Sequence, residues 1–269
     1  YHIQQVQGAG YFSVVFVAHQ LFCGRFVRPV AIKISRQTGL TDETAPQLFG
    51  DALVLAKLLA SSDHEGRRHL VQMHDMGLLP ECDNRAYLVM EYFARGDLRA
   101  QMTGPLSPTC ALVFALEIAT ALDAIHRAGI LHRDLKPGNV MVRDDGSLAL
   151  IDFGLAKHRA LELEITDKGL IFGTPHYMSP EQGHGQSTDA RSDLYSLGVV
   201  LHELLTAEKP FDGDNPMAII YKHAKAPVPR LPLALQSLQP LLDRLLAKRR
   251  EDRYESASTA IAAIDEHLQ

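Results

Sequence analysis

The order of apolar and polar positions divides the chain into a strand-rich first part and a helical second part. Residues 11–20 and 28–35 are short runs rich in Val, Ile and Phe, bounded by Gly or Pro, and they predict strands, as does the run at 85–93. Residues 45–60 instead repeat apolar side chains at helical spacing. The positions that carry this spacing are Leu48, Ala52, Leu55 and Leu59. We therefore expect a small sheet with one helix, joined near residues 90–96 to the helical second part.

Helical patterns dominate the second part. Residues 107–129 predict a long helix, with Ser107 as its N-cap, Pro108 in its first turn and Gly129 at its end. Residues 155–175 lack periodicity and predict a surface loop. Further helices are expected at 192–205, 238–250 and 257–268, with an extended proline-rich connector at 226–232.

Composition narrows the classes of function. The formal net charge is -5 and the sequence pI is about 6.2, which argues against a nucleic-acid partner. The cysteines Cys23, Cys82 and Cys110 are far apart, so we expect neither disulfides nor a zinc knuckle, and a reducing compartment. No run of about 18 apolar residues predicts a membrane span. Because the chain starts at Tyr1 rather than Met, we expect it to be a piece of a longer protein.

Two features of the first part suit phosphate binding. Gly8 and Gly10 lie in a turn between strands, where the lack of a Cβ lets backbone N–H groups approach a phosphate. A plain hairpin turn is the alternative. Lys33 ends the strand motif "VAIK", and it would suit gripping phosphates if an acid held it, although a solvent-facing lysine is the alternative.

The segment "HRDLKPGN" at 132–139 carries the most specific chemistry. Asp134 is placed to accept a proton from a hydroxyl, and Lys136 to neutralise phosphate charge. Asn139 can bind a metal through its amide oxygen, and the strand–turn–strand pattern at 140–151 would bring Asp152 back beside it. Oxygen ligands of this kind suit Mg²⁺. The alternative is a surface loop followed by an unrelated Asp-Phe-Gly turn.

These motifs occur in an order that resembles the eukaryotic-type (Hanks-type) protein kinases, most of all the bacterial Ser/Thr kinases. In chain order they read "GAGYFSVV", "VAIK", "HRDLKPGN", "DFG", "GTPHYMSPE", "SDLYSLG" and "REDRY". The resemblance covers about residues 1–269 and implies an α+β, bilobal fold. Residues 1–90 would form a small antiparallel β-sheet lobe with helix αC, 91–96 the hinge, and 97–269 a larger, mainly helical lobe.

The resemblance also implies an ATP site. Lys33 would hold the α and β phosphates, and Asp51 would stand where most active kinases offer a Glu to that lysine. Glu43 is the weaker alternative for this acid, and a solvent-facing role is the alternative for Asp51. The other residues implied at the nucleotide are Gly8, Ala9, Gly10, Ser13, Val15, Ala31, Met90, Glu91, Phe93 and Met141.

The implied chemistry is phosphoryl transfer to Ser or Thr hydroxyls of proteins. Asp134 would be the base, Lys136 would steady the γ-phosphate, and Asp152 and Asn139 would bind Mg²⁺, with Mn²⁺ as a substitute. Thr174 would hydrogen-bond near Asp134, as in Ser/Thr kinases. The alternatives are a pseudokinase or ATP-binding scaffold with weak transfer, suggested by Asp51, and a small-molecule kinase.

Further expectations concern regulation and structure. Thr166 is expected to be autophosphorylated in a transient homodimer, with Arg133 and Lys157 binding the phosphate, although a plain exposed Thr is the alternative. We expect no membrane contact by this segment and a cytoplasmic location, as a free domain or as the cytoplasmic domain of a longer, membrane-anchored chain. The resemblance further implies a Glu181–Arg253 ion pair, Asp193 bracing the catalytic loop, and His132 packed beneath it.

Overall fold

The computed structural model describes residues 1–10, 12–60, 65–152 and 175–269, without the side chains of 46–51, 60 and 65. The chain forms two compact units. Unit 1 comprises Tyr1–Ser61 and Val71–Ala94, and unit 2 comprises Ser62–Leu70 and Arg95–Gln269. Ser62–Leu70 thus groups with the later part of the chain, whereas the sequence suggested one joint at 91–96. The hinge at 91–96 remains a prediction.

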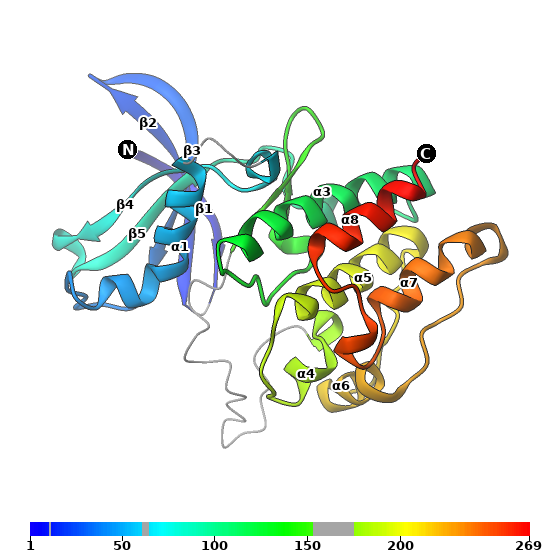
Figure 1. Ribbon diagram of the computed structural model, residues 1–269. Coiled ribbons are helices and arrows are strands. Elements are labelled where there is room, and N and C mark those ends of the chain that lie inside the picture. Colours follow the sequence, from blue (N-terminus) through cyan, green and yellow to red (C-terminus); the bar gives the residue numbers. More distant parts are fainter. Residues whose placement is uncertain (11, 61–64, 153–174) are drawn as a thin grey trace. The chain divides into compact units, whose positions relative to one another are not determined.

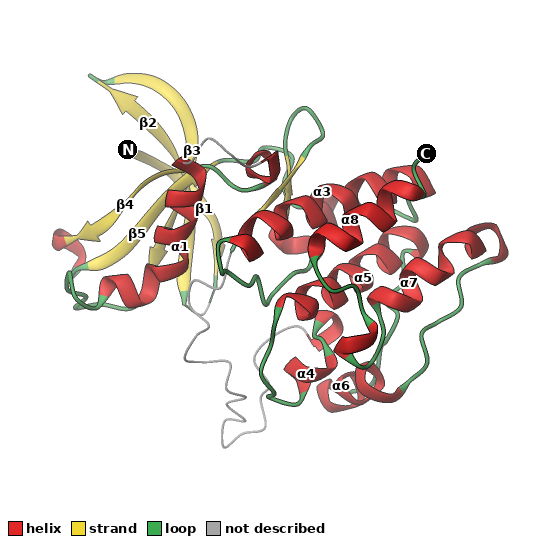
Figure 2. Cartoon of the chain, viewed as in Figure 1, coloured by secondary structure: helices red, strands yellow, loops and turns green. Residues whose placement is uncertain are grey.

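Unit 1 is an antiparallel sheet with one long helix, as the sequence predicted (Figure 2). The strand order is β1-β2-β3-β5-β4. The strands are β1 (His2–Ala9), β2 (Ser13–Phe22), β3 (Arg25–Ser35), β4 (Met73–Leu79) and β5 (Arg85–Glu91), and the helix is α1 (Ala45–Ala60). Strand β4 was not predicted, because its sequence, MHDMGLL, does not alternate cleanly.

The core of unit 1 follows the two-residue period of its strands. Val30 and Ile32 point to the same face of β3, where Val30 is paired with Ala18 of β2 and Ile32 with Val89 of β5. All four side chains are buried. Two-residue turns with both φ angles positive suit β-hairpins, and Cys23 and Gly24 adopt φ of 49° and 76° between β2 and β3.

Unit 2 is mainly helical, with one small hairpin (Figure 1). Its central helix α5 (Ala190–Thr206) is buried on nearly every side, as expected of a core helix. Its other α-helices and its strands are α2 (Leu98–Gln101), α3 (Pro108–Arg127), α4 (Pro180–Gly183), α6 (Pro216–Lys225), α7 (Gln239–Leu245), α8 (Ala257–Glu266), β6 (Val140–Val142) and β7 (Leu148–Leu150). Helix α3 packs against α5 and α8.

Helix α3 confirms the predicted boundary signals. The Ser107 hydroxyl accepts from the Cys110 amide at 3.3 Å, and Gly129 adopts φ of 77° just beyond the last turn. By length and composition alone α3 could cross a membrane, which the sequence analysis had not predicted for any segment. It is the only such helix in the part of the chain that the structure describes. Half of its apolar 18-residue stretch is buried inside the structure, as in the core helix of a globular unit.

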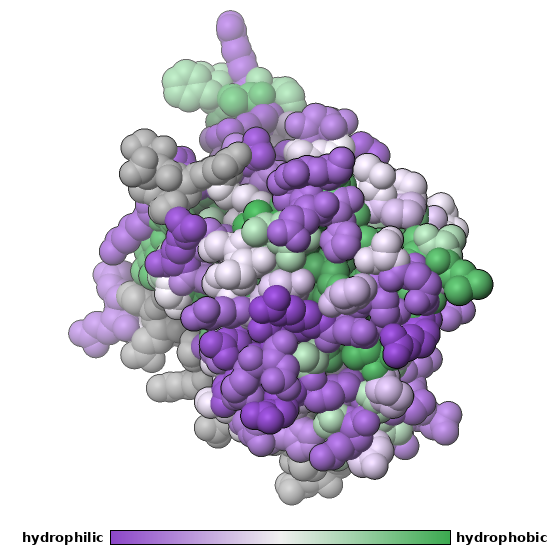
Figure 3. Space-filling model, turned by 45° about the vertical axis from the view of Figure 1, so that its right-hand side comes forward, coloured by the Kyte–Doolittle hydropathy of each residue, from purple (hydrophilic) through white to green (hydrophobic). Residues whose placement is uncertain are grey.

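The molecular face in Figure 3 is mostly hydrophilic, with small apolar groups.

Helix α7 is shorter than predicted. It ends at Leu245, whereas the apolar pattern predicted a helix to residue 250. The carbonyls of Ala247 and Lys248 accept hydrogen bonds from the Arg253 guanidinium, at 2.8 and 3.3 Å. We attribute the early end to these bonds, because they engage carbonyls beyond the last turn and a side chain satisfies them in place of further helical bonds.

Residues Glu65–Leu70 are held against the rest of unit 2 by the Arg143 side chain and by close packing. Arg143 Nη1 donates to the carbonyl of Arg68 at 2.6 Å, and Nη2 to that of Leu70 at 3.1 Å. A Cβ on Gly66 would lie 2.4 Å from the backbone oxygen of Thr120 in α3, so only glycine permits this contact. The segment is therefore held against the rest of unit 2 both by Arg143 and by its packing on α3.

Candidate functional site

The predicted catalytic loop brings three polar side chains together. The Asp134 carboxylate oxygen Oδ2 accepts from Lys136 Nζ at 2.9 Å and from Asn139 Nδ2 at 3.0 Å. The same Asn139 nitrogen donates to the Asp134 backbone carbonyl at 2.8 Å. The Asp134 and Lys136 side chains are 21% and 23% exposed, so the charged groups are held in place but remain reachable from solvent.

The β6–β7 hairpin returns the chain to this loop. Val140, Met141 and Val142 pair with Leu150, Ala149 and Leu148. Just beyond the paired strands, the Ile151 amide donates to the Asn139 carbonyl at 3.0 Å. Asp152 therefore directly follows the backbone partner of Asn139. The sequence predicted this return, and the hairpin confirms it at the level of the backbone.

His132 connects the loop to the end of the hairpin. Its Nδ1 accepts from the Asp134 amide at 3.3 Å, and its Nε2 lies 2.9 Å from the Ile151 carbonyl, so the ring is neutral with the proton on Nε2. Burial lowers the pKa of His132, against the opposing pull of Asp193 and Asp134, which keeps the ring neutral at pH 7. The predicted position beneath the loop is confirmed, since His132 is fully buried.

Asp193, in the first turn of α5, holds the backbone at the start of the loop. Its Oδ2 accepts from the His132 amide at 2.9 Å and from His126 Nε2 at 2.8 Å, and its Oδ1 accepts from the Arg133 amide at 2.8 Å. Burial alone would raise the pKa of Asp193, but the hydrogen bond and charge of His126 and the loop amides outweigh it and lower the pKa. The predicted bracing role is confirmed by these contacts.

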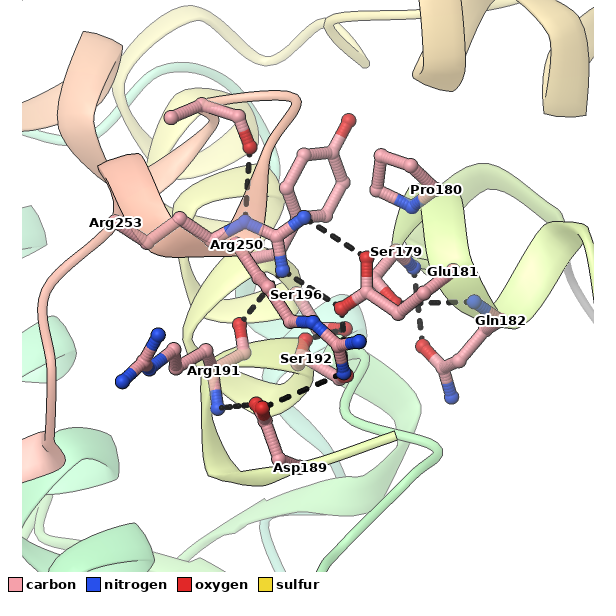
Figure 4. A network of polar contacts seen from close by, with 12 residues as sticks. Ser179, Pro180, Glu181, Gln182, Asp189, Arg191, Ser192, Ser196, Arg250 and Arg253 are labelled. Atoms are coloured by element: carbon pink, nitrogen blue, oxygen red, sulfur yellow. Dashed lines mark hydrogen bonds and ion pairs between the residues drawn. The ribbon is translucent and has the colours of Figure 1, made fainter. Parts of the chain in front are cut away.

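A buried ion pair joins α4 to the segment after α7 (Figure 4). The Arg253 guanidinium donates to Glu181 through Nη1 at 2.7 Å and Nη2 at 2.9 Å, as predicted. Ser192 of α5 donates to the same carboxylate at 2.6 Å. Burial alone would raise the pKa of Glu181, but the bonds from Arg253 and Ser192 lower it to about 2. The predicted ion pair is confirmed by these contacts.

The turn before α4 carries contacts that sequence reasoning missed. The Tyr177 hydroxyl donates to Glu203 of α5 at 2.6 Å, and His176 lies 3.1 Å from Asp212. Burial, followed by the Glu203 carboxylate, raises the pKa of Tyr177. Gln182 of α4 donates to the Arg133 carbonyl at 2.8 Å. The Ser179-x-x-Gln182 spacing of a capping box was the available sequence signal for Gln182.

Four of the residues predicted at the nucleotide, Val15, Ala31, Lys33 and Met90, share one face of the sheet in unit 1. Val15 is paired with Lys33, and Ala31 with Met90, while Ala31 and Lys33 are two residues apart in β3. Gly10 makes the tight turn between β1 and β2 by donating to the Ser13 carbonyl at 2.8 Å. Gly8 was predicted to lie in the turn, but it belongs to strand β1, where it is paired with Val15. The remaining predicted positions are Ala9 in β1, Glu91 at the end of β5, and Phe93 just beyond it.

Some predicted residues lie outside what the structure describes. Thr166, Thr174 and Lys157 fall in residues 153–174. Asp51 is in α1, but its side chain lies outside the described residues. Met141, by contrast, is a described residue of β6, where its neighbour Asp97 forms an isolated bridge to it.

Comparisons with known proteins find similar sequences along nearly the whole chain. A family model described as "Protein kinase domain" matches residues 1–263. "Serine/threonine-protein kinase PknB" of Mycobacterium leprae is 35% identical over 268 residues, which is 96% of this chain and 41% of that protein. "Serine/threonine-protein kinase PknL" of Mycobacterium tuberculosis is 37% identical over 240 residues, 87% of this chain and 57% of that protein. "Probable serine/threonine-protein kinase PknB" of Lactococcus lactis is 34% identical over 261 residues, which is 94% of this chain and 40% of that protein. The chain thus spans about half the length, or less, of these curated relatives.

Proposed function

This chain belongs to the protein kinase family, and we propose that it transfers the γ-phosphoryl group of Mg-ATP to Ser and Thr hydroxyls of proteins. The observation that carries the proposal is the Asp134 carboxylate, held in place by Lys136 and Asn139 yet reachable from solvent. The names of the relatives, all Ser/Thr protein kinases, support the choice of acceptor. Lys136 after the base agrees with that class.

Asp134 receives the acceptor proton in this proposal. The substrate oxygen forms a bond to the γ-phosphorus, the bond from that phosphorus to the β–γ bridging oxygen breaks, and ADP leaves. Asp134 takes the hydroxyl proton as the new bond forms. Lys136, 2.9 Å from the base, carries the positive charge that faces the transferred group. Positioning and charge neutralisation supply the acceleration.

The face of the unit 1 sheet that carries Val15, Ala31 and Met90 is apolar beside Lys33. Such a face suits the adenine ring of a nucleotide whose phosphates lie near the lysine. We assign Lys33 to the α and β phosphates and Asp51 to its ion-pair partner. We assign the backbone of Gly8, Ala9, Gly10 and Ser13 to the phosphates. Met141 is assigned to the adenine ring, and the backbone of Glu91 and Phe93 to hydrogen bonds with the edge of that ring.

Asn139 and Asp152 fit a hard divalent cation by their donor chemistry. The Asn139 amide nitrogen is committed to Asp134, so its carbonyl oxygen is the atom left to coordinate a metal. Asp152 supplies carboxylate oxygens, and this all-oxygen set suits Mg²⁺, with Mn²⁺ as a substitute. The ion, when bound, neutralises charge on the phosphates. Protein kinases as a family use ATP and a divalent metal, and here their use is part of the proposal.

The partners in this proposal are proteins with exposed Ser or Thr, and a second copy of the chain during autophosphorylation. Thr174 would help orient the acceptor. We place the chain in the cytoplasm, as a free domain or as the cytoplasmic domain of a longer, membrane-anchored protein. In either case this segment itself makes no membrane contact in the proposal.

The test is phosphoryl transfer by the purified chain. Incubation with Mg-ATP labelled at the γ-phosphate and a generic basic protein should label Ser and Thr residues, identified by mass spectrometry. Asp134→Asn should lower kcat by about 10²- to 10⁴-fold with little change in the KM for ATP. Labelling that is equal in the two proteins would refute the assignment of the base.

One observation favours a second candidate, a pseudokinase. Asp51 is one methylene shorter than the Glu that most kinases offer to the strand lysine. Tight binding of Mg-ATP, measured by calorimetry, with no transfer above the Asp134→Asn background would establish that alternative. Restored transfer in Asp51→Glu would then identify the short acid as its cause.

A further inference from the structure

The peptide unit that leads into Asp134 is held at both of its polar ends. Its carbonyl, from Arg133, accepts from Gln182 Nε2 at 2.8 Å, and its amide, from Asp134, donates to His132 Nδ1 at 3.3 Å. Arg133 itself adopts φ of 63°, in the left-handed region that residues other than glycine rarely occupy. Asp193 holds the Arg133 amide at 2.8 Å. Such a conformation persists only where surrounding contacts hold it.

Gln182 serves two segments with the two ends of one amide. Its Oε1 accepts from the Ser179 amide at 3.0 Å, while the Ser179 hydroxyl accepts from the Gln182 amide at 3.3 Å, which completes the capping box of α4 (Figure 4). Its Nε2 is directed to the Arg133 carbonyl. A Glu would complete the capping box equally well, but it has no hydrogen to donate to Arg133. The capping box therefore accounts for the amide oxygen of Gln182 but not for its amide nitrogen, which serves only the bond to Arg133 among the described contacts.

We propose that Gln182 is a positioning residue for the phosphoryl transfer: it fixes the Arg133–Asp134 peptide relative to α4, and so fixes the direction of the Asp134 carboxylate. This inference rests on the proposed function. Helix α4 begins three residues after the turn Pro175–Tyr177, so Gln182 links the segment that follows this turn to the peptide before the base. Gln182 acts through Asp134 and has no contact with the reacting atoms in this proposal.

Gln182→Glu is the informative variant, because it keeps the acceptor of the cap and replaces the donor to Arg133 by a charged oxygen that cannot donate. We expect kcat for peptide phosphorylation to fall about ten- to a hundredfold, with the KM for Mg-ATP within about twofold of the wild type. Amide hydrogen exchange in the peptide that covers residues 131–136 should become faster. Gln182→Met, of similar length and unable to hydrogen-bond, should show the same loss of kcat.

Thr259→Ala is the matched control. Thr259 occupies the same N3 position in the capping box of α8, far from the loop in sequence and without a contact to it among those described. Its loss removes the side chain at N3 of a capping box, as Gln182→Met does, and should leave kcat and the exchange of residues 131–136 unchanged. An active wild type with an unaffected kcat in Gln182→Glu would overturn this inference alone. A wild type that transfers no phosphoryl group would overturn the proposed function together with the role of Gln182 in it.

Discussion

Arg253 meets Glu181 through two hydrogen bonds, at 2.7 and 2.9 Å, although the residues are 72 positions apart in the sequence. The Arg253 side chain is fully buried and that of Glu181 is 6% exposed. The two-pronged geometry matches the planar guanidinium to the carboxylate. The pair therefore joins α4, next to the turn Pro175–Tyr177, to the C-terminal part of unit 2.

Removal of one member of this pair should be more damaging than removal of both. Arg253→Met leaves a buried carboxylate without its partner, and we expect it to lower the free energy of unfolding by about 3–5 kcal/mol. In the double variant with Glu181→Gln, part of that loss should be recovered, because no charge is left unpaired. Urea unfolding of the four proteins in the cycle measures the coupling. Strictly additive effects would contradict the picture of one coupled pair.

Acid should weaken the same pair within a defined pH range. The pKa of Glu181 is about 2 in the folded protein, below its ordinary value of 4.5. A carboxyl with a lowered folded pKa adds stability that is complete above the unfolded value and is lost as the pH falls toward the folded value. The difference in unfolding free energy between wild type and Glu181→Gln should therefore shrink by up to about 3 kcal/mol between pH 5 and pH 2. A difference that stays constant over this range would show that Glu181 does not titrate as described.

Gly66 should tolerate no side chain. A Cβ at this position would lie 2.4 Å from the Thr120 backbone oxygen, and backbone atoms cannot move aside as a flexible side chain can. Gly66→Ala should cost about 1–3 kcal/mol of unfolding free energy. Gly104→Ala is the control, since nothing lies within 4 Å of its added Cβ. Thermal unfolding of the two variants compares them, and an equal effect would mean that Gly66 is not closely packed.

Thr166 should become phosphorylated when the wild-type chain is incubated with Mg-ATP. The added phosphate carries about -1.5 to -2 charges, and Arg133 and Lys157 supply the opposite charge in this proposal. Peptide mapping by mass spectrometry should find the modification in wild type and not in Asp134→Asn. Thr166→Ala should lower kcat toward substrates several-fold. A fully active wild type with unmodified Thr166 would refute the assignment.

The sequence was informative wherever a short motif determines a local structure. Ser107 and Gly129 mark the ends of α3, and the hairpin after Asn139 follows from the apolar runs around Gly146. Asp193 and the Glu181–Arg253 pair followed from the resemblance to kinases. These contacts were predictable because the motif fixes both partners.

Contacts between a side chain and a distant backbone carbonyl were not predictable. The end of α7, the clamp of Arg143 on the Arg68 carbonyl, and the bond from Gln182 to Arg133 all have this form. Every residue has a backbone carbonyl, so no sequence pattern identifies which carbonyl will be the acceptor. Only the fold decides which carbonyl a given Arg or Gln meets.

The docking of Glu65–Leu70 has a practical consequence for dividing the protein. A gene fragment that encodes only residues 95–269 would omit this segment, and the face of α3 that receives Gly66, together with Arg143, would lose its covering. We expect such a fragment to express poorly or to precipitate. Supplying the missing stretch as a synthetic peptide, or grafting it onto the start of the fragment, should restore a soluble product.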